Sequence, residues 1–294
     1  MSSCKLAVDI MGGDQAPQST SKAVLSIAGL VPEVQFYVVG LPHVLSQYFT
    51  ARPSNIHLVP VEASIEMDMT AAQATSLGST SSMGRMLEML KAKEVDIALS
   101  AGSTAALMSL SYLTLKMQPN VRRPSIVSSL FYKGKRKYIT DLGANIAPKA
   151  SDLLANAQVA LKEIAREHPS VALLNVGKED SKGTPLLKEA SELFKASDMN
   201  YVGFVEGGDI ITSDVDLIVC DGFVGNCVTK LLESLIAVTE PHVSSPSVLP
   251  SVHHAALLAG LNGLVFKAHG GSSTQDFAQA IRDVLSYKII PITI

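Results

Sequence analysis

One local design recurs along the chain and restricts its fold more than any other feature. A short apolar run ends in a turn of Gly, Ser, Asn or Asp, and a segment with helical spacing follows. In the clearest case, the run Val215–Val219 leads into the turn Cys220–Asn226, and a helix is expected from Asn226 onward. Strands that alternate with helices favour a mostly parallel sheet between helices. The sequence therefore predicts a three-layer α/β/α sandwich.

The remaining elements follow the same pattern. Strands are expected at 5–10, 34–40, 56–61, 95–100, 125–130, 138–142, 170–176, 200–205 and 264–266. Helices are expected at 18–29, 71–93 with an interruption at 78–82, 105–116, 149–167, 185–196 and 274–286. The Pro- and Ser-rich segment 239–252 is predicted to be an exposed linker. We expect residues 1–294 to form one α/β domain, with two subdomains as the alternative.

Composition argues against several classes of function. The formal net charge is −3, aromatic residues are 5% of the chain and Trp is absent, so a nucleic-acid surface has little support. No uncharged apolar run approaches the about 18 residues that a membrane span needs. Three cysteines without CxxC spacing, and an N-terminus unlike a signal peptide, fit a cytoplasmic protein.

Motifs for metal or nucleotide cofactors are also missing. The chain has no HExxH, and its adjacent His253 and His254 cannot both face one side of a helix. It has no GxGxxG, so a nicotinamide cofactor has no support. We therefore expect neither a metal nor a cofactor.

Polar and charged side chains follow the ends of the predicted strands. The residues that share this placement are Ser103, Thr104, Asp141, Asn145, Lys182, Asn226, Lys267 and His269. Parallel strands end at one edge of a sheet, where helix N-termini offer N–H groups to an anion. We expect these loops to converge on one small-anion pocket.

A plainer interpretation stays open at each of these turns. Gly and Asn build turns without any ligand, and Ser103, Thr104 or Asn226 suits a helix cap. The charged loop 177–183 has the composition of a solvated surface loop. Cys227 is interpreted as a small buried residue, with an acyl-accepting thiol as the alternative.

Eight stretches carry a resemblance to the bacterial phosphate acyltransferase family, the PlsX family. They occur in family order over nearly the whole chain: Leu6–Asp14, Ser81–Met83, Ser100–Met108, Thr140–Asn145, Leu173–Gly183, Tyr201–Ile210, Val219–Asn226 and Leu261–Ser273. The resemblance implies a fold similar to that of phosphotransacetylases and of isocitrate and isopropylmalate dehydrogenases. It implies an enzyme of phospholipid and fatty acid metabolism that makes acyl phosphate from acyl-[acyl carrier protein] and inorganic phosphate.

The same resemblance implies partners. They are acyl carrier protein, inorganic phosphate, a second copy in a homodimer, a glycerol-3-phosphate acyltransferase and a membrane that is contacted peripherally. Nucleic acid is not among them. The chain departs from the family pattern at Ser103, where an amide is usual, at Ala105, where a Gly is usual, and at Gly208, where an Arg is usual. The basic run usual before Ser81 is absent, and the region 235–255, where the family has an amphipathic membrane-contacting helix, is shortened.

The matched motifs and the strand-end placement together suggest roles. Phosphate binding is assigned to Ser103, Thr104, Asn145 and Lys267, and catalysis to Lys182, Asn226, His269 and Asp141. Lys182 holds phosphate and Asn226 positions it. His269 or Lys267 donates to the oxyanion or the leaving sulfur, and Asp141 orients Lys182 or Asn145. The alternatives are a phosphotransacetylase that uses short acyl-CoA and a non-catalytic relative that keeps the fold.

Overall fold

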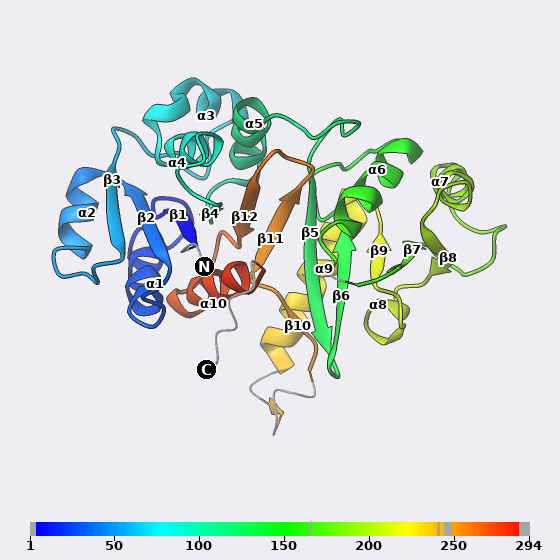
Figure 1. Cartoon of the computed structure of the whole chain (residues 1–294). Coiled ribbons are helices and arrows are strands. Elements are labelled where there is room, and N and C mark those ends of the chain that lie inside the picture. The colour runs from blue at the N-terminus through cyan, green and yellow to red at the C-terminus, as the bar shows by residue number, and fades with distance from the viewer. Residues whose placement is uncertain (1–3, 165, 240–241, 244–248, 288–294) are drawn as a thin grey trace. The chain divides into compact units, whose positions relative to one another are not determined.

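Contacts divide the chain into two compact units, and Figure 1 shows their elements in a computed structural model. Unit 1 contains residues 1–117 and 254–294, and unit 2 contains residues 118–253. The structure describes residues 4–164, 166–239, 242–243 and 249–287. Each unit has its own strands and covering helices, so the fold is the mixed α/β arrangement with a mostly parallel sheet that the sequence predicts.

The strands of unit 1 lie in the order β3-β2-β1-β4-β12-β11. All neighbours are parallel except β11 and β12. The strands are β1 (Lys5–Asp9), β2 (Gln35–Gly40), β3 (Ile56–Pro60), β4 (Ile97–Ser100), β11 (Ala255–Ala259) and β12 (Leu264–Ala268). The helices are α1 (Gln18–Ala28), α2 (Pro42–Tyr48), α3 (Ala71–Leu77), α4 (Ser82–Lys91), α5 (Thr104–Leu115) and α10 (Thr274–Tyr287).

Helices from distant parts of the sequence cover the sheet of unit 1. The helices α1 and α10 lie side by side, whereas α3, α4 and α5 form a second group (Figure 1). Met83, Met86, Leu87 and Leu90 of α4 are buried, which confirms the apolar stripe expected from their spacing. The predicted interruption is present, because Ser81 Oγ accepts the Gly84 N–H and begins α4 as a separate helix.

The strands of unit 2 lie in the order β10-β5-β6-β9-β7-β8, and β6, β9, β7 and β8 are mutually parallel. The strands are β5 (Ser125–Tyr132), β6 (Lys135–Thr140), β7 (Ser170–Leu174), β8 (Asn200–Val205), β9 (Leu217–Val219) and β10 (Ser251–Val252). The helices are α6 (Ala150–Leu161), α7 (Pro185–Lys195), α8 (Asp209–Thr212) and α9 (Gly222–Thr239). The predicted hairpin through the basic loop joins β5 and β6.

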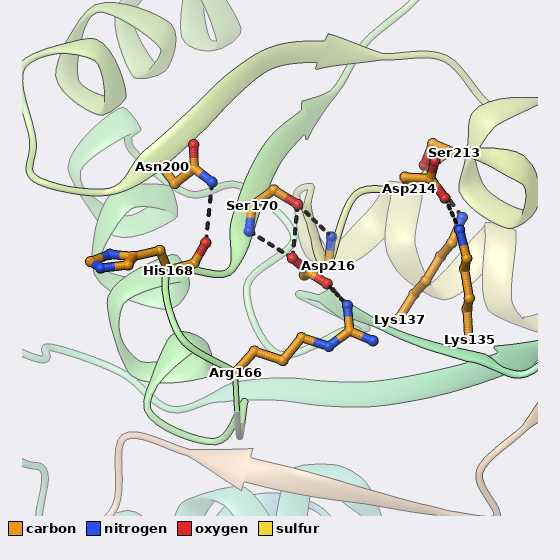
Figure 2. Close-up of polar contacts among 9 residues, drawn as sticks. All are labelled: Lys135, Lys137, Arg166, His168, Ser170, Asn200, Ser213, Asp214 and Asp216. Atoms are coloured by element: carbon orange, nitrogen blue, oxygen red, sulfur yellow. Dashed lines mark hydrogen bonds and ion pairs between the residues drawn. The ribbon is translucent and has the colours of Figure 1, made fainter.

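Helix α6 ends at Leu161 rather than at 167, and a polar network next to it gives the reason. Asp216 pairs with the Arg166 guanidinium and accepts hydrogen bonds from the Ser170 N–H (2.8 Å) and hydroxyl (2.9 Å) (Figure 2). Ser170 begins β7, and Asp216 directly precedes β9. The network therefore draws the chain out of the helix and into the sheet, at the edge where β7 and β9 start.

Helix α9 begins four residues earlier than predicted. The turn glycines Gly222 and Gly225 are its only buried residues, while Phe223, Leu231, Leu235 and Val238 are more than half exposed. Among the described residues α9 is the one helix long and apolar enough to cross a membrane, which by itself is weak evidence. The sequence expectation of no uncharged run still holds, because Lys230 and Glu233 interrupt α9.

Half of the linker predicted at 239–252, residues 240–241 and 244–248, lies outside the described residues. Within it, Thr239 ends α9 and Ser251–Val252 forms β10, which pairs with β5.

Candidate functional site

Three parallel neighbours, β1, β4 and β12, end side by side in unit 1. Asp9 and Ser100, the last residues of β1 and β4, are paired, and Ser100 is paired with Lys267, the residue before the end of β12, so the three strands end at nearly one level. The loops that follow are joined to one another, since the Asp14 N–H donates to the Gly270 carbonyl (2.8 Å). The adjacency expected for these strand ends is therefore present within this unit.

Asp9, which is not among the predicted site residues, organises this edge. It is fully buried, and its carboxylate accepts the Ser100 hydroxyl (2.8 Å) and the Met11 N–H (3.1 Å). The Ser100 hydroxyl in turn accepts the Gly102 N–H (3.0 Å). Burial raises the pKa of Asp9, against the hydrogen bonds that favour its charged form. A carboxylate-hydroxyl-amide chain thus fixes the start of the loop that leads into α5.

The loops after β1 and β4 approach so closely that only glycine fits between them. A Cβ atom on Gly12 would lie 2.5 Å from the Gly102 nitrogen. Such an approach is the usual reason for glycine where backbone forms a site. The edge of unit 1 is consequently lined by backbone rather than by bulky side chains.

Ser103 and Thr104 lie at the N-terminus of α5. Ser103 occupies the N-cap position, but its side chain makes no capping hydrogen bond, so the plain capping interpretation is wrong for this residue. Thr104 is the first helical residue, and both side chains are half-buried. Unpaired N–H groups and a positive partial charge are typical of this position, and they favour an anion.

Lys267 and His269 belong to the neighbouring strand end. The Lys267 ammonium donates to the carbonyls of Ala101 (3.3 Å) and Ala268, which places it against the loop that enters α5. His269 is exposed, and its carbonyl accepts the Ser272 hydroxyl (2.7 Å). The structure thus groups the loops of four predicted site residues, Ser103, Thr104, Lys267 and His269, at one edge of unit 1.

In unit 2, Asp141 holds the loop that follows β6. Its Oδ1 accepts the N–H groups of Ile126 (2.9 Å) and Ala144 (3.1 Å), and its Oδ2 accepts the backbone N–H (2.6 Å) and side-chain amide (2.9 Å) of Asn145. Burial is the main influence on this carboxyl and raises its pKa. Of the two expected orienting roles, the structure therefore shows the one toward Asn145.

Asn145 is itself engaged within the protein. Its side-chain amide donates to Asp141 and to the Pro124 carbonyl (3.0 Å), and the residue is buried. An amide group has two donor hydrogens, so both are used. A direct phosphate contact by these hydrogens would require one of the two bonds to break.

The first turns of α9 pack against this loop. Asp221 Oδ1 accepts the Val224 N–H (2.9 Å), so Asp221 caps α9 and the capping interpretation of Asn226 is wrong. Asn226 is exposed and faces Gly143, where an added Cβ would lie 3.7 Å from the Asn226 Cβ. The helix start thus brings Asn226 beside the Asp141–Asn145 loop.

The two nearby cysteines differ from each other in burial. Cys220 is buried, and burial raises the pKa of its thiol. Cys227 is exposed, which contradicts the expectation that it fills a small buried site.

Lys182 lies in the loop after β7, the next strand of the parallel set. It is exposed, and its ammonium pairs with Glu179 (2.9 Å). The alternative role for Asp141, orientation of Lys182, is not seen among these contacts. Unit 2 therefore carries Asp141, Asn145 and Asn226 in one contact group, with Lys182 on the adjacent loop. The expectation that the groups of both units share one phosphate stays a prediction.

No group of three or more His, Cys, Asp or Glu with the arrangement of a metal site occurs in the part of the chain that the structure describes. Sequence reasoning missed Asp9, Asp221 and Asn175, the last of which holds the Lys182 loop. Asp9 ends β1, Asn175 directly follows β7, and Asp221 comes two residues after β9. A polar residue at or just after the end of a buried strand is the signal that could have identified them.

Comparison with known proteins gives concordant results. Residues 4–243 match the model of a family described as "Fatty acid synthesis protein". A phosphate acyltransferase of Pseudomonas fluorescens is 35% identical over 97% of this chain and 94% of its own length. One from Dichelobacter nodosus is 34% identical over 94% of this chain and 89% of its own.

Solved structures agree on the fold. A phosphotransacetylase from Staphylococcus aureus has a TM-score of 0.65 at 18% identity, and the match covers 97% of this chain and 92% of that one. A branched-chain phosphotransacylase from Enterococcus faecalis has the same score and identity, with 97% and 100% covered. At this identity the likeness supports the arrangement of strands and helices alone.

Proposed function

Because the chain belongs to the phosphate acyltransferase family, we propose that it transfers an acyl group from acyl-[acyl carrier protein] to inorganic phosphate. The products are acyl phosphate and the free carrier protein, and the reaction serves phospholipid and fatty acid synthesis. The observation that carries the proposal is 35% sequence identity to a phosphate acyltransferase over nearly the whole length of both chains.

The proposed acyl transfer needs no strong general base, so the protein mainly has to orient the reactants and stabilise the oxyanion. The second pKa of inorganic phosphate is about 6–7 by analogy with phosphate esters, so part of it is already the nucleophilic dianion at neutral pH. That oxygen attacks the thioester carbon, a C–O bond forms, the C–S bond breaks and the thiolate leaves. The leaving thiol has a pKa of about 8.5 and takes up a proton from water or from a donor such as His269. Alignment of reactants and stabilisation of the oxyanion remain as the protein's task.

Each unit supplies suitable groups for this task. In unit 1, the start of α5 presents N–H groups and the hydroxyls of Ser103 and Thr104, which suit the oxygens of phosphate. In unit 2, the exposed amide of Asn226 and the exposed ammonium of Lys182 suit positioning and charge neutralisation. Asp9 holds the loop that leads into α5, and Asp141 holds the loop that Asn226 faces.

The test is release of free thiol from acyl-[acyl carrier protein], measured with a thiol reagent with and without inorganic phosphate. We expect phosphate-dependent release that falls at least tenfold in Lys182→Ala. Lys188→Ala is the matched control, because Lys188 is an exposed lysine on α7, the helix directly after the same loop. Equal thiol release with and without phosphate would contradict the proposal.

A parallel arm with short acyl-CoA separates the two thioester substrates. Faster turnover of acyl-CoA would identify a phosphotransacetylase instead. A protein that leaves both thioesters intact would fit the non-catalytic alternative.

We further propose that the protein works in the cytoplasm as a homodimer, meets membranes peripherally and passes acyl phosphate to a glycerol-3-phosphate acyltransferase. The exposed apolar side chains of α9 support an additional contact surface of some kind. Co-sedimentation with anionic vesicles and the mass in solution test the membrane and dimer proposals separately. If α9 contacts the membrane, Leu231→Gln should reduce the fraction of protein that sediments with vesicles. If α9 forms the dimer contact, the same change should reduce the fraction of dimer.

A further inference from the structure

The loop between β7 and α7 carries Lys182, and Asn175 joins its two ends. Asn175 directly follows β7 and is 7% exposed. Its side-chain oxygen accepts the Val176 N–H (2.8 Å) at the start of the loop. Its side-chain amide donates to the Lys182 carbonyl (3.4 Å) at the end of the loop. The backbone N–H of Asn175 donates to the Val205 carbonyl (2.8 Å), which anchors the residue to β8.

Gly183 gives Asn175 the space that this arrangement needs. A Cβ atom on Gly183 would lie 2.4 Å from Asn175 Oδ1 and 2.9 Å from its Nδ2. The backbone of Gly183 has φ +93°, a conformation that L-residues rarely adopt. The residue after Lys182 is thus held against the Asn175 amide by both shape and backbone conformation.

The Lys182 side chain is placed by the same loop. Its stem passes over Gly177, since a Cβ atom there would lie 2.4 Å from Lys182 Cδ. Its ammonium pairs with Glu179, and its backbone N–H donates to the Glu179 carbonyl (3.0 Å). The position of the ammonium therefore depends on the closed shape of the loop.

We propose that Asn175 is a positioning residue for the acyl transfer, and that it acts by fixing the place of the Lys182 ammonium. The inference rests on the proposed function, in which Lys182 holds phosphate. Asn175 itself is buried beneath the loop and needs no contact with either substrate. Its loss should therefore matter only through Lys182.

A double-mutant cycle tests this dependence. Asn175→Ala removes both side-chain bonds, and the usual worth of two neutral hydrogen bonds predicts a roughly 5- to 150-fold fall in kcat/KM for phosphate. In a Lys182→Ala background the same change should cost less than about twofold. A general loss of folding would lower both backgrounds by the same factor, and equal losses would overturn the proposal.

A glycine pair supplies a second test that leaves Asn175 in place. Gly183→Ala drives a methyl group into the Asn175 amide, and we expect it to lower kcat/KM in the same way. Gly203→Ala is the matched control, because Gly203 has φ +94° but no described atom within 4 Å of an added Cβ. Both variants place a methyl group on a residue of nearly the same positive φ. Equal activity of the two variants would overturn the proposal.

A readout independent of turnover separates this inference from the proposed function. Lysine acetylation with a trace of acetic anhydride, followed by mass spectrometry, reports the environment of each ammonium. Asn175→Ala should change the labelling of Lys182 severalfold and leave Lys188 unchanged. This pattern in a protein that proves inactive on every thioester would refute the proposed function and support the positioning role. Unchanged Lys182 labelling would refute the positioning role.

Discussion

Asp141→Asn tests whether one buried carboxylate holds the edge of unit 2. Each carboxylate oxygen accepts two N–H groups, one pair from Ile126 and Ala144 and the other from the backbone and side chain of Asn145. Asparagine has one oxygen and one donor amide. Whichever way it turns, its amide faces two other donors.

The cost follows from the cheaper of the two orientations. If the new amide faces Asn145, that side chain can flip and accept, but its bond to the Pro124 carbonyl is then lost and the Asn145 N–H stays unpaired. Two hydrogen-bonding groups are left unsatisfied, at about 1–3 kcal/mol each. Removal of the buried charge offsets part of this. We expect a net loss of about 2–4 kcal/mol in the free energy of unfolding.

Urea unfolding followed by circular dichroism measures this loss, and Asp221→Asn is the control. Asp221 caps α9 through one bond to the Val224 N–H, and asparagine caps as well as aspartate. The control should therefore differ from the parent by a few tenths of a kcal/mol. A loss below about 1 kcal/mol in Asp141→Asn, or one equal to that of the control, would refute the argument from the four bonds.

Three further outcomes follow from the same geometry. Gly225→Ala places a methyl group 2.0 Å from the Asp141 carbonyl oxygen, so we expect it to lower the free energy of unfolding by about 1–3 kcal/mol and to lower Tm in a thermal melt. Gly207→Ala, with open space among the described residues, should leave Tm unchanged. Burial raises the pKa of Asp9, so the parent protein loses free energy of unfolding as pH rises from about 3.9 through the raised pKa. Asp9→Asn lacks this titration. The excess in free energy of unfolding of the parent over Asp9→Asn should therefore shrink over that range, as measured by urea unfolding at several pH values. Glu179→Gln frees the Lys182 ammonium and should lower KM for phosphate by less than about fivefold, while a raised KM would show that Glu179 positions the lysine.

Strand positions were predictable because buried strands leave a strong signal. The run before Cys220 is apolar, and the stretch before Asp141, although it begins with Lys135–Lys137, ends in Tyr138, Ile139 and Thr140. The two proved to be parallel neighbours, β9 and β6. Parallel pairing then places the residues that follow at one edge, which is why the contact between the Asp141 loop and Asn226 follows from the pattern.

Helix ends were less predictable because tertiary contacts decide them. Asp221 caps α9 and extends it to Gly222, so the two glycines expected in a turn lie inside the helix. Arg166 leaves α6 early to pair with Asp216, a residue 50 positions away. The local sequence does not predict the start of α9 or the end of α6, because each depends on which strand lies beside the helix terminus.

The structure separates site residues by whether their donors are already used, which sequence pattern does not reveal. By sequence pattern, Asn145 and Asn226 both follow neighbouring strands and both fit a cap or a ligand contact. In the folded chain both amide hydrogens of Asn145 donate to neighbouring groups of the protein. Asn226 is exposed, and Asp221 rather than Asn226 caps α9. The same distinction holds between Ser81, which caps α4, and Ser103, whose hydroxyl makes no capping bond. Residues that the scaffold leaves unused at a strand edge are those with groups to offer a substrate, which makes Ser103 and Asn226 stronger candidates for direct contact than Asn145.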